Sequence, residues 1–142
     1  MASQFSTQVR AVWQAVHNPG AGLTFPEAVS RLLSIGVTRY HVDYVAKTVT
    51  AYSDGADPKV DVAPAPDLQF VDKAYEWNLA QVEESIRGAV NVSYAEFSRG
   101  VIQGGVVNYW AYLIGKRVVY CGALGDLHVQ WFPGVQPPPK KD

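Results

Sequence analysis

The chain has 142 residues, a length that one domain with a single core usually has. Hydrophobic residues make up 48% of the chain and charged residues 18%, which is the composition of a folded protein and excludes a disordered one. The 12 Lys and Arg residues against 13 Asp and Glu give a formal net charge of -1, which argues against non-specific binding to nucleic acid or to anionic lipid.

The sequence also bears on the cellular compartment. No uninterrupted apolar run approaches the roughly 18 residues of a membrane span, and the first residues lack the basic start and the apolar stretch of a signal peptide. Cys121 is the only cysteine, which excludes an intramolecular disulfide and a metal site with several cysteines. We therefore expect a cytoplasmic protein that does not contact a membrane.

Two helices and three strands are predicted in the first half of the chain. Residues 8–18 carry an apolar stripe at helical spacing. A second helix begins at Thr24, which has the capping-box spacing to Glu27, and ends at Gly36, because glycine most easily adopts a left-handed conformation. Apolar residues then alternate, which predicts three strands, over residues 40–45, 48–52 and 59–63.

The same order of elements returns in the second half. Residues 81–91 resemble the first helix, and residues 93–109 align with residues 24–40 without a gap. Ser93 and Glu96 repeat the capping box, and Gly105 repeats the helix stop. Strands are predicted over three further ranges, residues 109–114, 117–121 and 127–132.

This repetition predicts the fold class and the domain organisation. We predict an α+β protein in which a helix-helix-strand-strand-strand unit is duplicated in tandem, with an antiparallel sheet or sheets backed by four helices and with pseudo-twofold symmetry. Residues 1–136 are predicted to form a single domain of two repeats, residues 4–64 and 77–135. Residues 137–142 have no apolar content to bury and are predicted to form a disordered Pro- and Lys-rich tail.

One helix and the segment after it resemble a known family. The helix that begins Thr24-Phe25-Pro26-Glu27 and stops at Gly36-Val37, before an aromatic strand and a hairpin, resembles the YdfO-like family of small bacterial and prophage proteins, which are often labelled phage envelope proteins. The resemblance covers about residues 8–132. The second copy departs from the family pattern at Ala95, where the first copy has Pro26. It implies an α+β fold of duplicated units and supplies no catalytic residue, because the family has no established biochemical function.

Strand alternation predicts a candidate binding face. If Tyr40 and Val42 point toward the helices, His41 and Asp43 point to the opposite face, where the second copy places Trp110 and Tyr112. Neighbouring strands are expected to add Arg117 and His128, although the pairing register does not follow from the sequence. The predicted ligand-binding residues are therefore His41, Asp43, Trp110, Tyr112, Arg117 and His128. Such a mixed aromatic face suits a small planar ligand, a protein partner such as a second copy, or ordinary packing.

The residues favour a non-enzymatic cytoplasmic binding or interaction module, with no cofactor and no metal, and the resemblance implies a phage or prophage origin for it. His17, His41 and His128 lie far apart without the spacing of metal ligands. One alternative is a small hydrolase with His41 as base and Asp43 as its orienting group, to which Cys121 could add a nucleophile. The other alternative is a structural phage component.

Overall fold

The computed structural model describes residues 3–18, 22–65 and 76–135, so the predicted tail at 137–142 lies outside the described residues. The chain runs helix, helix, strand, strand, strand, and then repeats this order. The helices are α1 (Gln4–Val16), α2 (Phe25–Ser34), α3 (Leu79–Arg87) and α4 (Tyr94–Gln103). The strands are β1 (Arg39–Asp43), β2 (Thr48–Ser53), β3 (Lys59–Pro64), β4 (Val106–Tyr112), β5 (Arg117–Gly122) and β6 (Leu127–Trp131).

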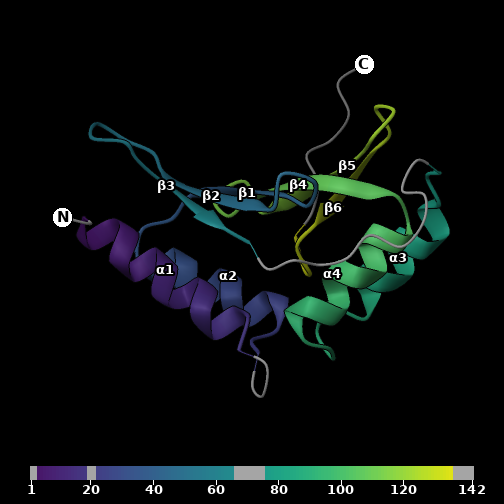
Figure 1. The fold of residues 1–142 in the computed structure, drawn as a ribbon, viewed down its shortest axis with the longest axis horizontal. Coiled ribbons are helices and arrows are strands. Elements are labelled where there is room, and N and C mark those ends of the chain that lie inside the picture. Colours follow the sequence, from purple (N-terminus) through teal and green to yellow (C-terminus); the bar gives the residue numbers. More distant parts are fainter. Residues whose placement is uncertain (1–2, 19–21, 66–75, 136–142) are drawn as a thin grey trace.

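The six strands form one antiparallel sheet in the order β3-β2-β1-β4-β5-β6. The central strands β1 and β4 come from different halves of the chain, so one continuous ladder joins the two halves. The four helices lie on one face of the sheet (Figure 1), and no helix of the described residues covers the other face. The predicted α+β class, with four helices behind an antiparallel sheet, is confirmed.

The helices α2 and α4 begin at the residues that the sequence indicated. The Oγ1 of Thr24 accepts a hydrogen bond from the Glu27 amide, and the Glu27 carboxylate accepts one from the Thr24 amide at 3.1 Å. Ser93 caps α4 with its Oγ, which accepts from the Glu96 amide at 3.2 Å. These bonds satisfy amides that have no partner inside the helix, so the starts are fixed locally.

Residues with positive φ close the turns at matching places in both halves. Gly36 (φ 94°) and Gly105 (φ 100°) follow α2 and α4, where glycine takes the left-handed conformation at little cost. Lys47 (φ 60°) and Lys116 (φ 58°) stand in the β1–β2 and β4–β5 turns, where a side chain makes the same conformation cost about 1 kcal/mol. Both pairs have the same separation in the sequence.

The core lies between the helices and the covered face of the sheet, and its centre contains buried tyrosines. The Tyr94 and Tyr109 hydroxyls are hydrogen-bonded, the Tyr40 hydroxyl lies 3.4 Å from that of Tyr109, and the Tyr44 hydroxyl donates to Ser98 at 3.1 Å. Burial raises the pKa of Tyr40 and of Tyr44 above the ordinary tyrosine range. Each of these hydroxyls has a hydrogen-bond partner in the core, either another tyrosine or Ser98, so its burial does not leave it unsatisfied.

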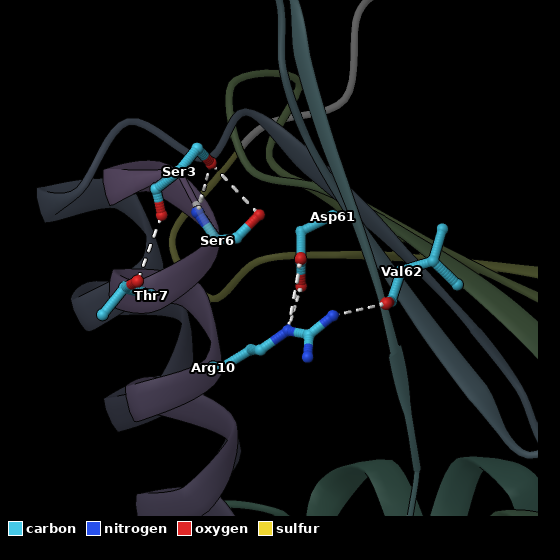
Figure 2. A network of polar contacts seen from close by, with 6 residues as sticks. All are labelled: Ser3, Ser6, Thr7, Arg10, Asp61 and Val62. Carbon is cyan, nitrogen blue, oxygen red and sulfur yellow. Dashed lines mark hydrogen bonds and ion pairs between the residues drawn. The ribbon is translucent and has the colours of Figure 1, made fainter. Parts of the chain in front are cut away.

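The helix α1 is attached beneath the edge strand β3. The Nε of Arg10 donates to both carboxylate oxygens of Asp61, at 3.3 and 3.4 Å, and Nη2 donates to the Val62 carbonyl at 3.1 Å (Figure 2). The Asp61 side chain is only 4% exposed, although it belongs to an outer strand. An inward-pointing charge on an edge strand discourages pairing with another chain, so this contact both holds α1 and protects the edge.

The helix α3 packs against α4 through two glycines. A Cβ at Gly104 would lie 2.6 Å from Val82 Cγ2, and a Cβ at Gly100 would lie 2.9 Å from Ser85 Cβ, so a side chain at either position would displace α3. In the alignment of the two halves, Arg31 occupies the position of Gly100. The glycines therefore let α3 approach α4 closely, whereas α1 lies beneath its edge strand.

Candidate functional site

The uncovered face of the sheet presents its side chains in three rows, each of which crosses all six strands. The arginine row consists of Val60, Tyr52, Arg39, Tyr112, Arg117 and Trp131. The central row consists of Val62, Thr50, His41, Trp110, Val119 and Val129. The aspartate row consists of Pro64, Thr48, Asp43, Asn108, Cys121 and Leu127.

Aromatic rings and guanidinium groups alternate along the arginine row. The Cζ of Arg39 lies 4.0 Å from the centroid of the Tyr52 ring, and the Cζ of Arg117 lies 4.0 Å from the centroid of the Trp131 ring. Tyr112 stands between the two arginines, as the cross-strand neighbour of both. Cation–π attraction stabilises each guanidinium over its ring, so both arginines are held on the sheet surface.

The two arginines differ in the charge around them. Arg39 donates to the carboxylate of Asp54 at 3.1 and 3.3 Å, and Thr38 donates to the same carboxylate; the hydrogen bonds from Thr38 and Arg39 lower the pKa of Asp54. Arg117 donates only to the Gly115 carbonyl, at 3.4 Å, and no carboxylate of the described residues pairs with it. Within the part of the chain that the structure describes, the positive charge of Arg117 is therefore not compensated by a carboxylate.

Trp110 is the centre of an aromatic cluster that extends over three strands. Its ring centroid lies 4.6 Å from that of His41, 5.8 Å from that of Tyr52 and 5.9 Å from that of Tyr112. The Tyr52 and Tyr112 rings are stacked on it, with interplanar angles of 30° and 17°. These contacts hold the rings in fixed positions at the surface, which reduces the entropy that a ligand must remove when it binds.

A hollow of about 570 Å³ lies at the middle of the arginine row, beside Arg39, Tyr112 and Arg117. Its walls come from β1, β4, β5 and the turns beside them, and its lining residues are Thr38, Arg39, Asp54, Tyr112, Ile114, Gly115, Arg117 and Val119. The volume is in the range of small-molecule sites. Two arginines and one aspartate line the hollow, which gives it one net positive charge.

Five of the six predicted site residues share this face, and the sixth does not. Tyr120 and His128 are direct cross-strand neighbours and their rings are stacked with centroids 6.3 Å apart, on the face that the helices cover. The Nε2 of His128 also lies 3.2 Å from the Oε1 of Gln130 on that side. The expectation that His128 joins the open face is therefore wrong, because the β5–β6 register, which sets the face, is a non-local property.

The hydrolase alternative gains no support from the geometry. The Oδ1 of Asp43 accepts hydrogen bonds from the amides of Val45 and Ala46, both at 2.9 Å, so this carboxylate closes the β1–β2 turn. Among the hydrogen bonds of the described residues, none joins His41 to Asp43. Burial raises the pKa of Cys121, which disfavours its nucleophilic thiolate form.

Sequence reasoning missed four members of the arginine row: Val60, Tyr52, Arg39 and Trp131. Arg39 stands two residues before His41, and Tyr52 stands two residues after Thr50, so strand alternation already placed both on the open face. Only the cross-strand register brings each arginine beside a ring, and that register does not follow from the sequence.

A second hollow, of about 370 Å³, lies on the helix side of the sheet beneath β6. Its lining includes Phe25 of α2, Ile86 and Arg87 of α3, and Gln130 of β6. Gly100 and Gly104 let α3 lie close against α4, and this packing leaves the helix side of β6 less covered. We call this second hollow the β6 groove.

Comparison with known proteins adds no assignment: no protein-family model matches the chain, and no curated protein matches it. Within residues 3–18, 22–65 and 76–135, no helix has the length and apolar character needed to cross a membrane. The same residues contain no group of three or more His, Cys, Asp or Glu side chains that could hold a metal ion. The site must therefore be interpreted from its own geometry.

Proposed function

We propose that the protein is a non-enzymatic binding module whose open sheet face holds a small ligand. One observation carries this proposal: a fixed cluster of rings around Trp110 stands beside the arginine row, on a face that no described helix covers. Aromatic and arginine side chains together supply apolar area and hydrogen-bond donors, the combination that binding surfaces favour.

The non-enzymatic part of the proposal rests on the roles of the polar residues. Asp43 is engaged in a turn, His41 lies against Trp110, and the pKa of Cys121 is raised. A general base needs an orienting partner and a reachable substrate proton, and a nucleophile needs a lowered pKa or an adjacent base. These three residues supply binding contacts and turn stability instead.

A screen of small planar compounds by two-dimensional ¹H–¹⁵N NMR tests the proposal. The tryptophan side chains are convenient reporters. Trp110 and Trp131 belong to the open face, whereas Trp13 belongs to α1 and is buried in the core. We expect ligands to shift the indole signals of Trp110 and Trp131 and to leave that of Trp13 unchanged. Because Trp131 also lines the β6 groove, binding that leaves the Trp110 signal unshifted, or no binding at all, would contradict the proposal.

A protein partner is the competing occupant, and light scattering separates it from a small ligand. If the purified protein is a dimer and Trp110→Ala makes it a monomer, the face is an interface between two copies. Leu124→Ala is the matched control, because Leu124 is exposed in the turn between β5 and β6 and belongs to none of the three rows. If the unmodified protein and the Trp110→Ala variant are both monomers, the face is accessible to a ligand.

We also infer that the two halves arose by tandem duplication and are related by a pseudo-twofold axis at the sheet centre. The register supports this, because His41 pairs with Trp110, its counterpart in the gapless alignment, as an axis through that pair requires. The positive φ values at Gly36 and Gly105, and at Lys47 and Lys116, support it independently. Membership of the YdfO-like family, a phage origin and a cytoplasmic location stay predictions of the sequence.

A further inference from the structure

We propose that the hollow at the middle of the arginine row binds a planar aromatic carboxylate, with Arg117 holding the carboxylate group. This inference rests on the proposed binding function and names the class of ligand. It depends on three features of the hollow: the uncompensated charge of Arg117, the ring and aliphatic side chains beside it, and the single net positive charge of its lining.

Arg117 has the donors that a carboxylate requires. Its Nε donates to the Gly115 carbonyl, and its two terminal nitrogens make no hydrogen bond with the described residues. A guanidinium presents these nitrogens as a planar fork that matches the two oxygens of a carboxylate. The Trp131 ring, 4.0 Å from Cζ, holds the group in place, so little side-chain entropy is lost when the anion binds.

The rest of the hollow suits the aromatic part of such a ligand. Tyr112 stands between the arginines in the row, and its ring is already stacked on Trp110. Ile114, which is 66% exposed, and Val119 add aliphatic surface to the lining. A planar ring that contacts these side chains removes apolar area from water and adds an aromatic contact.

The charge of the lining favours a monoanion over a polyanion. Asp54 binds Arg39 through two hydrogen bonds, so Arg39 is compensated and Arg117 supplies the net charge. A nucleic-acid strand would place several phosphates over the face and would meet the negative charge of Asp54. One carboxylate matches Arg117, the one charged group of the hollow's lining that has no partner of opposite charge among the described residues.

Isothermal titration calorimetry with 2-naphthoate and its neutral analogue 2-naphthamide tests the inference. We expect the carboxylate to bind roughly tenfold or more tightly at low salt, because hydrogen bonds to charged groups are the stronger ones. Arg117→Gln is expected to remove this preference, and Arg117→Lys to keep part of it. Arg99→Gln is the matched control, because Arg99 is an exposed arginine on α4 and not on the sheet face. Circular dichroism checks that each variant is folded.

The outcomes distinguish this inference from the proposed function. Equal binding of the two compounds, a preference that survives in Arg117→Gln, or no binding of 2-naphthoate would overturn the carboxylate assignment. The proposed function would still stand if other planar compounds shift the Trp110 indole signal. If no compound shifts that signal, both proposals are contradicted.

Discussion

His41 and Trp110 lie directly opposite each other where β1 pairs with β4, and their ring centroids are 4.6 Å apart. Each residue comes from a different half of the chain, so the aromatic cluster exists only when the halves are joined. The candidate site is thus a property of the whole sheet and not of either half. The predictions that follow test the contacts that hold this sheet and its helices together.

The first prediction separates the roles of Asp43 and His41. Asp43→Ala is expected to lower the free energy of unfolding by about 1–2 kcal/mol, because two turn amides lose their acceptor. His41→Ala removes only a cross-strand ring contact, which contributes about 0.2–1 kcal/mol. Urea denaturation measures both values. A larger loss in His41→Ala than in Asp43→Ala would show that the turn does not depend on the carboxylate.

The second prediction concerns the glycine contact between α3 and α4. Gly104→Ala is expected to destabilise the protein by about 1–3 kcal/mol, because the new methyl group would lie 2.6 Å from Val82 Cγ2 and 3.1 Å from the Val82 amide nitrogen. Gly88→Ala is the control, because Gly88 also caps a helix, and its nearest atom, Glu84 O, is 3.7 Å away. Thermal unfolding compares the stabilities of the two variants. Equal stabilities would mean that α3 can move away at no cost.

The third prediction tests the contact that attaches α1 to β3. Arg10→Met is expected to cost about 1–3 kcal/mol, because it leaves the buried Asp61 carboxylate without its donor. The double variant Arg10→Met/Asp61→Val is expected to recover most of that loss, because the strand position then becomes apolar. A double-mutant cycle in urea gives the coupling energy. Additive effects of the two changes would contradict a direct interaction.

The fourth prediction is a pH dependence of stability. Burial lowers the pKa of His17 from its usual 6.5, so the unfolded chain binds the proton more readily than the folded one. Stability is therefore fully present above the unfolded pKa and is lost as the pH falls through it toward the lower folded pKa. His17→Gln is expected to reduce the loss between about pH 7.5 and 5. Urea denaturation across this range measures the effect, and an unchanged pH profile would rule it out.

The carboxylates do not obscure that test. The pKa of Glu27 is lowered by its hydrogen bonds with Thr24, and that of Asp54 by those from Thr38 and Arg39. The ordinary pKa values of these side chains are 4.5 and 3.8, so the stability linked to both groups is lost at a more acidic pH than that of His17.

Much of the fold could be predicted because its signals are local. The hydroxyl of Thr24 three residues before Glu27, the glycine at 36 and the alternation that follows specify a helix, a stop and a strand without reference to the rest of the chain. The same signals at Ser93 and Gly105 gave the second set of elements. Hence the strand ranges were predicted within a few residues.

The contacts that complete the site and the edges are non-local, so the sequence could not supply them. The face of His128 depends on a register with β5, and the alternation of rings with arginines depends on four registers at once. Asp61 falls within the strand predicted over residues 59–63, but its burial and its contact with Arg10, 51 residues away, depend on how α1 packs against β3. A local sequence pattern does not indicate which distant residue a side chain will contact.

The β6 groove makes the two borders of the sheet unequal. The strand β3 is attached to α1 by the hydrogen bonds of Arg10, whereas β6 depends mainly on its ladder with β5 and has the β6 groove beneath it. We expect β6 to fray before β3, so that its amide hydrogens exchange with deuterium sooner and a protease finds its first entry there. Global unfolding would then begin at the C-terminal border and spread inward.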